Sequence, residues 1–266
     1  MTIIAGRLRD AELPDSPTAR LDAELLLAAA LGKSRSFRHT WPERIVPTEA
    51  ANAFVANLQS RRDGEPVAYI LGSQGFWSLD LSVSSASLVP RGDTETLIAA
   101  LLEHCPAHHA DLSFLDLGTG TGCILLAALA EYPKAWGVGV DVNPAAAILA
   151  YGNARRCNLS ARALIMAGQW VEALSAQSRF DVVFSNPPYI PTTDLDGLME
   201  EVRRHAPVRP LDGGRDGPDA YRHLCARLTS LFNHNGVGII EVGTGQAPAL
   251  RDIAAHNELE CMPAIT

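Results

Sequence analysis

The 266-residue chain lacks long apolar segments. Apolar runs such as Leu25–Leu31 are far shorter than the ~20 residues that cross a bilayer. Residues Met1–Asp10 show no basic flank followed by an apolar core, the pattern of a secretory signal. We therefore expect a cytoplasmic protein with no membrane partner.

Lysine is scarce as well, and acidic residues outnumber basic ones. The formal net charge is -8 at pH 7, the sequence pI is ≈ 5.5, and the only lysines are Lys33 and Lys134. A protein that grips a phosphate backbone usually presents a basic face. The acidic balance therefore predicts no stable nucleic-acid partner.

Paired cysteines are also absent. The five cysteines are scattered and none forms a CxxC pair, which is typical of buried thiols in a reducing compartment. One cluster, His104-Cys105-x-x-His108-His109, contains metal-binding side-chain types. Because Pro106 interrupts the regular helical spacing that would gather these side chains, no metal site is predicted.

The overall composition is that of a globular protein, with 47% hydrophobic residues. The first third of the chain predicts helices over Leu21–Leu31, which ends at Gly32, and over Thr48–Arg62. The second helix is expected to turn one apolar face inward, formed by Ala51, Phe54, Val55 and Leu58. A β-hairpin or extended linker follows over Gly75–Val89.

Beyond Pro90-Arg91-Gly92, short apolar strands alternate with helices. This order predicts an α/β fold with a parallel sheet covered by helices on both faces. The expected strands are 112–117, 136–142, 163–167, 180–185 and 237–242. We place the domain boundary between an N-terminal helical domain with its hairpin, residues 1–87, and an α/β domain, residues 88–266.

A glycine-rich segment follows the first of these strands and opens a helix. It consists of Gly118, Thr119, Gly120, Thr121 and Gly122. Glycines at this place allow a ligand to approach the backbone, and the helix N-terminus offers free N–H donors. Asp141 ends the next strand, where a carboxylate can accept the two hydroxyls of a ribose. The pair predicts an adenosine-containing cofactor, either NAD or S-adenosylmethionine.

The segment Asn186-Pro187-Pro188-Tyr189 ends the fourth strand, beside the expected cofactor crevice. Its chemistry suits methylation of a planar NH2 group, whose lone pair is delocalised. The side-chain oxygen of Asn186 and the carbonyl of Pro187 can each accept one N–H, which fixes the nitrogen toward a methyl donor. The prolines stiffen the loop, and Tyr189 can pack on the flat substrate group or near a sulfonium.

Over nearly its whole length the sequence resembles the HemK/PrmC protein-(glutamine-N5) methyltransferases. These enzymes modify the glutamine of the GGQ loop in class I peptide-chain release factors. The resembling stretches, besides the two motifs above, are Pro66–Gly72, Phe76-Trp77, Leu88–Glu95, Phe180–Ile190 and Leu211–Gly217.

The resemblance implies a Rossmann-like class I methyltransferase domain that uses S-adenosylmethionine and no metal. It implies that the cofactor is bound by Gly118–Gly122, Asp141, Trp170 and Asn186, and the substrate amide by Asn186–Tyr189, with Asn186, Pro187 and Tyr189 in catalysis. It also implies a release factor as partner, held with the help of residues 1–87, and we expect a monomer.

Three departures from the family pattern bear on these expectations. Gly92 stands where the family usually has proline, and Gln169 stands where an acidic residue usually precedes the tryptophan. The family adds an antiparallel strand after its last helix, whereas here Glu258–Ile265 provides one candidate strand, which we expect to dock loosely. Two alternatives therefore stay open: an amino-methyltransferase of nucleic acid, of the N6-adenine type, and a catalytically impaired S-adenosylmethionine-binding paralogue.

Overall fold

The computed structural model describes residues 3–9, 13, 16, 18–197, 214 and 217–265. Contacts divide the chain into an N-terminal unit that extends to Gly72 and a second unit that begins at Ser73. Much of the Leu211–Gly217 stretch lies outside the described residues, so the prediction made for it has no structural counterpart here. None of the helices described is both long and apolar enough to span a bilayer.

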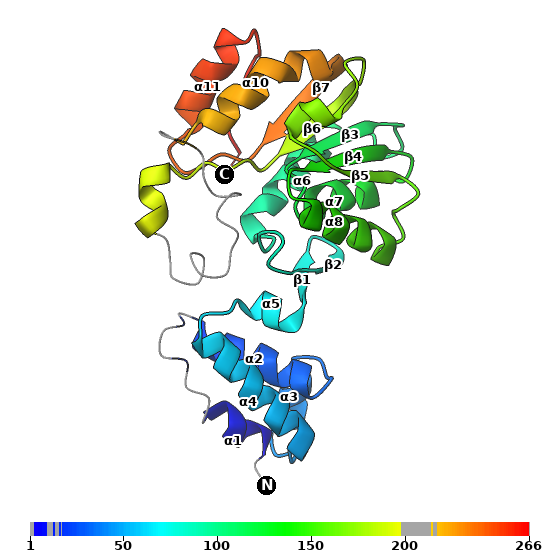
Figure 1. The fold of residues 1–266 in the computed structure, drawn as a ribbon. Helices are drawn as coiled ribbons and strands as arrows, with labels where there is room; N and C mark the ends of the chain where they lie inside the picture. The colour runs from blue at the N-terminus through cyan, green and yellow to red at the C-terminus, as the bar shows by residue number, and fades with distance from the viewer. Residues whose placement is uncertain are drawn as a thin grey trace. The chain divides into compact units, whose positions relative to one another are not determined.

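The N-terminal unit is built from helices, as the sequence predicted (Figure 1). Its helices are α1 (Ile4–Arg9), α2 (Ala19–Ala30), α3 (Phe37–Thr40), α4 (Thr48–Arg62) and α5 (Val67–Leu71). The two longest, α2 and α4, pack side by side through Leu26, Leu27, Phe54 and Leu58. Val55 was predicted on the same inward face but is 54% exposed. It follows Phe54 directly, and successive helical residues point about 100° apart.

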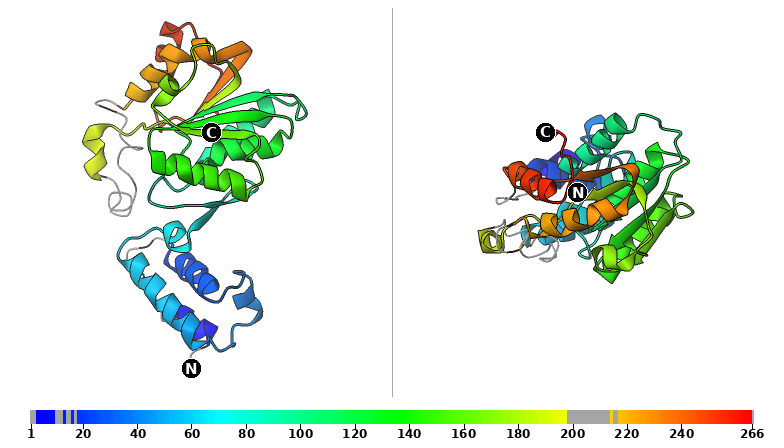
Figure 2. Two further views of the ribbon diagram at one scale, coloured as in Figure 1. Left: turned by 45° about the vertical axis from the view of Figure 1, so that its right-hand side comes forward. Right: turned by 90° about the horizontal axis from the view of Figure 1, so that it is seen from above.

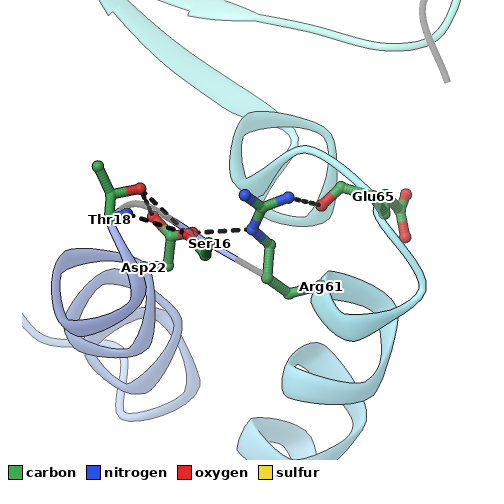
Figure 3. Close-up of polar contacts among 5 residues, drawn as sticks. All are labelled: Ser16, Thr18, Asp22, Arg61 and Glu65. Carbon is green, nitrogen blue, oxygen red and sulfur yellow. Dashed lines mark hydrogen bonds and ion pairs between the residues drawn. The ribbon is translucent and has the colours of Figure 1, made fainter. Parts of the chain in front are cut away.

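A buried ion pair joins α2 to α4. Arg61 Nε lies 2.8 Å from Asp22 Oδ2, and the two side chains are 9% and 7% exposed (Figure 3). The hydroxyls of Ser16 and Thr18 also donate to the Asp22 carboxylate, each at 2.8 Å. Arg61 Nη1 in turn donates to the carbonyl of Glu65, just before α5. One carboxylate thus ties the start of α2 to the end of α4.

The second unit contains a five-stranded parallel sheet in the order β5-β4-β3-β6-β7. Its strands are β3 (Ser113–Leu117), β4 (Trp136–Asp141), β5 (Ala163–Ala167), β6 (Phe180–Ser185) and β7 (Phe232–Ile240). Its helices are α6 (Glu95–His104), α7 (Cys123–Glu131), α8 (Pro144–Arg156), α10 (Asp219–Leu231) and α11 (Ala247–His256). Short 3-10 turns occupy η1 (Gly92–Thr94), η2 (Trp170–Ala173) and η3 (Thr192–Gly197).

Helices cover both faces of this sheet, which confirms the predicted layers (Figures 1 and 2). Alternate strand residues supply the two cores. Phe114 and Phe184 lie in the core that α6, α7 and α8 cover, whereas Leu115 and Val183 lie in the core with α10 and α11. A parallel sheet that is buried on both faces explains why its strands read as nearly continuous apolar runs.

The predicted hairpin forms between β1 (Ser73–Phe76) and β2 (Leu79–Ser82), and it packs into the second unit. Phe76 and Leu81 are fully buried in the core beside α6 and α7. The side chain of Asn153, on α8, accepts from the backbone N–H of Ser82 at 2.8 Å and donates to its carbonyl at 3.0 Å. The contacts therefore place the hairpin in the second unit, whereas the boundary predicted from the sequence lies after the hairpin.

The end of the described chain differs from the expected strand. Residues 257–265 contain no strand, and β7 is the last strand in the sheet order. Leu259 packs against the core beside α10 and α11, while Met262 and Ile265 are 49% and 46% exposed. Pro263 lacks an N–H donor, which disfavours sheet pairing at this place.

The buried ion pair gives a test of the N-terminal unit. Asp22→Asn removes the carboxylate charge that faces the Arg61 guanidinium at 2.8 Å, and breaking such a buried pair should cost about 3–5 kcal/mol. Hydrogen exchange followed by mass spectrometry should show the opening free energy of α2 and α4 fall by this amount. Arg20→Ala is the matched control, because Arg20 is 86% exposed in its ion pair with Glu24. A cost for Asp22→Asn no larger than that of the control would contradict the assigned role.

Candidate active site

One large cavity, of about 680 Å³, opens at the carboxyl ends of the parallel strands. Four strands of the sheet, β3, β4, β6 and β7, are in register near their carboxyl ends. Leu117 is paired with Val140 and with Ser185, and Ser185 is paired with Ile240. The residues that follow them therefore form one row along the edge of the sheet. That row is Gly118, Asp141, Asn186 and Glu241, and all four line the cavity.

The structure brings together almost all of the predicted site residues. Those that line the cavity are Gly118, Thr119, Gly120, Thr121, Asp141, Trp170, Asn186, Pro187, Pro188 and Tyr189. Gly122 does not line it. A Cβ on Gly122 would lie 3.2 Å from Leu126 and 3.3 Å from Ala150, so this glycine lets α7 pack closely on α8.

The glycine-rich loop is a cradle that a side chain would fill. Gly120 has a φ of +56°, and a Cβ on it would lie 2.8 Å from Ser87 Oγ. The conformation and the close contact both require glycine. At Gly118 and Gly120, which both line the cavity, the backbone therefore carries no side chain.

Asp141 holds this loop as well as facing the cavity. Its Oδ2 accepts from the backbone N–H of Gly120 and its Oδ1 from that of Asn143, both at 2.8 Å. Each carboxylate oxygen has a second lone pair, so the predicted contact with ribose hydroxyls is still available. The same side chain can therefore shape the loop and bind the ligand.

Asp116 is a second loop-holding carboxylate, which the sequence analysis did not single out. It is fully buried, and its Oδ2 accepts from the Thr119 hydroxyl at 2.7 Å. Burial raises its pKa to about 7; the negative charge of Asp141 adds to the rise, while the bond from Thr119 opposes it. The sequence does contain a signal for Asp116, because an acidic residue stands inside an apolar strand, directly before Leu117 and Gly118.

The Asn186–Tyr189 loop is held at both of its ends. Asn186 Nδ2 donates to Thr94 Oγ1 at 3.2 Å, across 92 positions of sequence. At the other end the carbonyl of Tyr189 accepts from Gln246 Nε2 at 2.8 Å, and the Tyr221 hydroxyl donates to Gln246 Oε1 at 3.1 Å. Thr94, Gln246 and Tyr221 come from segments that the motif itself does not reveal.

Glu241 faces the same loop from the end of β7. Its side chain lines the cavity, and its Oε2 is buried without a hydrogen-bond partner in the described part of the chain. Burial raises the pKa of this carboxyl, and burial followed by the charge of Glu241 raises the pKa of Tyr189. The sequence contains the same signal for Glu241 as for Asp141, because each is an acidic residue directly after an apolar strand.

Trp170 and Gln169 line the cavity on the side of β4 and β5. Trp170 has a φ of +45°, a strained value for a non-glycine residue, and its ring lies 6.2 Å from that of His223. Trp170 is the first residue of the turn η2. Gln169, one of the three departures from the family pattern noted in the sequence, thus faces the cavity with a neutral side chain.

The residues present fit S-adenosylmethionine. The cavity has the size of a cofactor site, it holds a glycine-rich cradle and Asp141 for the polar parts of the molecule, and carboxylates stand near for its positive charges. In the described ranges no group of three or more His, Cys, Asp or Glu side chains could hold a metal ion.

Comparison with known proteins agrees with this arrangement. The PrmC N-terminal domain model matches residues 4–72, and the methyltransferase small domain model matches residues 91–214. A methyltransferase from Pyrococcus furiosus has the same fold: its crystal structure superposes with a TM-score of 0.51 at 16% identity, over 74% of this chain and 87% of that one.

Two curated relatives are much more similar in sequence. The release factor glutamine methyltransferase of Rhodospirillum rubrum is 43% identical over 265 residues, which are 97% of this chain and 78% of the relative. That of Pseudomonas aeruginosa is 46% identical over 253 residues, 95% of this chain and 90% of the relative. The chain therefore belongs to the family of the release factor glutamine methyltransferases.

Proposed function

We propose that this protein transfers a methyl group from S-adenosylmethionine to the side-chain amide nitrogen of a glutamine, the one in the GGQ motif of class I peptide-chain release factors. The family membership supports the reaction and its substrate. The observation that carries the assignment to residues is the shared row of Gly118, Asp141 and Asn186 at one edge of the sheet. A cradle for the donor and acceptors for an amide thus line one cavity.

Bound S-adenosylmethionine supplies an electrophilic methyl group on a sulfonium. Asn186 Oδ1 and the carbonyl of Pro187 then accept the two N–H bonds of the substrate glutamine. Because both acceptors belong to one short loop, they fix the plane of the amide and turn its nitrogen toward the methyl donor. The hydrogen bond from Gln246 to the Tyr189 carbonyl keeps the loop in place during this step.

Transfer breaks the S–CH3 bond and forms an N–CH3 bond, so S-adenosylhomocysteine leaves and the amide nitrogen loses one of its two protons to water. No side chain is assigned as a general base in this scheme. Orientation of the two reactants is the main contribution of the site, and in well-oriented reactions it lowers the barrier by roughly 7–11 kcal/mol. Tyr189 closes the site beside the amide, where its half-buried ring can pack on the flat group.

We assign release-factor recognition to the N-terminal part of the chain, for which the sequence predicts a domain of residues 1–87. The model of the PrmC N-terminal domain matches residues 4–72, a helical unit with its own core. We also propose a cytoplasmic location, because the substrate is a protein of translation, and a monomeric state.

The nucleic-acid alternative is not favoured, because both relatives reported above are named release factor glutamine methyltransferases. Transfer of labelled methyl groups tests the choice directly. The substrates are a purified release factor, the same factor with its GGQ glutamine replaced by alanine, and duplex DNA. We expect label on the first alone; label on DNA would refute the proposed substrate, and no label at all would favour the impaired paralogue.

Asn186→Ala should abolish transfer and leave cofactor binding nearly intact, because the side chain contacts the reacting amide. We expect turnover to fall more than tenfold, equivalent to about 1.4 kcal/mol or more of lost transition-state stabilisation. Calorimetry with S-adenosylmethionine measures whether the variant still binds the cofactor. A variant that keeps a tenth or more of the wild-type turnover would remove Asn186 from its assigned role.

Removal of the N-terminal unit should separate substrate choice from chemistry. A fragment that starts at Ser73 keeps the hairpin, whose Phe76 and Leu81 belong to the core of the second unit. It should bind cofactor and methylate a short glutamine peptide, but methylate the release factor poorly. A fragment that starts at Leu88 is the comparison, and it should lose cofactor binding because the core is opened. Equal losses on peptide and protein by the Ser73 fragment would contradict a recognition role.

A further inference from the structure

A series of hydrogen bonds behind the Asn186–Tyr189 loop joins two backbone groups through two side chains. The backbone N–H of Gly243 donates to the Tyr221 hydroxyl at 3.1 Å, and that hydroxyl donates to Gln246 Oε1 at 3.1 Å. Gln246 Nε2 then donates to the carbonyl of Tyr189 at 2.8 Å. We call these three bonds the Tyr221–Gln246 network. It links the segment after β7, the first turn of α10 and the residue before α11 to the loop.

The two backbone groups at its ends fix the direction of every bond in the network. A backbone N–H only donates, and a backbone carbonyl only accepts. The Tyr189 carbonyl therefore requires the nitrogen of the Gln246 amide, which leaves Oε1 toward Tyr221. Since the Tyr221 hydroxyl accepts from Gly243, its single proton is available for that oxygen. Exchange of the amide oxygen and nitrogen would instead place two acceptors 2.8 Å apart.

Burial and close packing support the network. Tyr221 is fully buried, and burial raises the pKa of its hydroxyl to about 12, against the opposing effect of the bond from Gly243. The hydroxyl therefore keeps the proton that it donates. A Cβ on Gly243 would lie 2.8 Å from Gln246 Oε1, and a Cβ on Gly217 would lie 2.8 Å from Nε2. The amide thus packs directly against the backbone at two glycines.

The loop depends on its two ends, because its middle has no backbone donors. Pro187 and Pro188 both lack an N–H, so neither can be anchored by donating a hydrogen bond. One end is held by the bond from Asn186 Nδ2 to the Thr94 hydroxyl, and the other by the bond that the Tyr189 carbonyl accepts. Loss of the second bond frees the loop on the side of Tyr189, and the Pro187 carbonyl with it.

We propose that Tyr221 is a positioning residue for methyl transfer: its hydroxyl selects the orientation of the Gln246 amide that holds the Tyr189 carbonyl, and thereby fixes the loop that accepts the substrate amide. Neither Tyr221 nor Gln246 lines the cavity, so both act through the loop. The inference rests on the proposed function, because a fixed loop matters for turnover only if it aligns a reacting group.

Tyr221→Phe removes the hydroxyl and keeps the ring, and Gln246→Met removes both polar atoms of the amide with little change of length. A small misplacement of reacting groups lowers turnover strongly, so we expect each variant to lower kcat for a glutamine peptide at least about tenfold. The Kd for S-adenosylmethionine should stay within about twofold of wild type, because the glycine-rich loop is unchanged. The double variant should equal Gln246→Met, because without the amide the hydroxyl has nothing to orient.

Tyr132→Phe is the matched control, since it also removes the hydroxyl of a fully buried tyrosine. That hydroxyl donates to the carbonyl of Cys105 at the end of α6, and Tyr132 does not line the cavity. The control should keep kcat within about twofold of wild type, even where its thermal midpoint falls as far as that of Tyr221→Phe. Gln246→Met, at a partly buried residue, keeps the test open if Tyr221→Phe fails to fold.

A second readout does not depend on methyl transfer. The side-chain NH2 protons of Gln246, assigned from their loss in Gln246→Met, should exchange slowly with solvent in wild type and in Tyr132→Phe, and faster in Tyr221→Phe. Unchanged protection in Tyr221→Phe, an unchanged kcat in either variant, an equal fall of kcat in the control, or additive losses in the double variant would each overturn the inference. A wild-type protein with the expected protection but no transfer to glutamine would instead refute the proposed function.

Discussion

Parallel pairing of the central strands is the constraint on which the rest of the site depends. Leu117 is in register with Val140 on one side and with Ser185 on the other, and Ser185 is in register with Ile240. Residues far apart in the sequence are thereby brought to a single edge. Each then needs only a short loop to place its functional group in the cavity, while the strands before it are fixed by two buried cores.

Carboxylates recur at this edge and just before it, and two of them hold the glycine-rich loop. Asp116 holds Thr119, Asp141 holds Gly120, and Glu241 stands beside Asn186. Burial raises the pKa of Asp116 and of Glu241, because removal from water disfavours the charged form of each carboxyl group. A cationic ligand is the natural complement of such a site, and the cofactor of this family carries both a sulfonium and an ammonium group.

Much of the fold could be read from the sequence, because the signals are local. Glycine and proline mark the ends of the helices, and apolar runs mark the strands of a sheet that is buried on both faces. Val55 was misplaced because a helical periodicity of 3.6 leaves the edge of an apolar face uncertain by one residue. The domain boundary after the hairpin stays a prediction, because only tertiary contacts, such as those of Asn153 with Ser82, show which core the hairpin joins.

Most of the predicted residues that line the cavity belong to compact motifs, whereas Asp141 was found from its place at a strand end and Trp170 from the family resemblance. Gly118–Gly122 and Asn186–Tyr189 are such motifs, and Gly122 differs only in serving the packing of α7. Thr94 and Gln246 act through contacts that span 92 and 57 positions of sequence, which no spacing rule within a motif can reveal. Glu241 needed one further fact, namely that β7 lies next to β6 and in register with it.

The central claim is that a substrate amide is held between Asn186 Oδ1 and the carbonyl of Pro187, facing the cofactor. A crystal structure of the protein with S-adenosylhomocysteine and a Gly-Gly-Gln peptide measures this most directly. The account predicts the glutamine nitrogen at hydrogen-bond distance, ~2.7–3.2 Å, from both oxygens, with its open face toward the sulfur. A glutamine nitrogen bound elsewhere, or an Asn186 that turns Nδ2 toward it, would contradict the account.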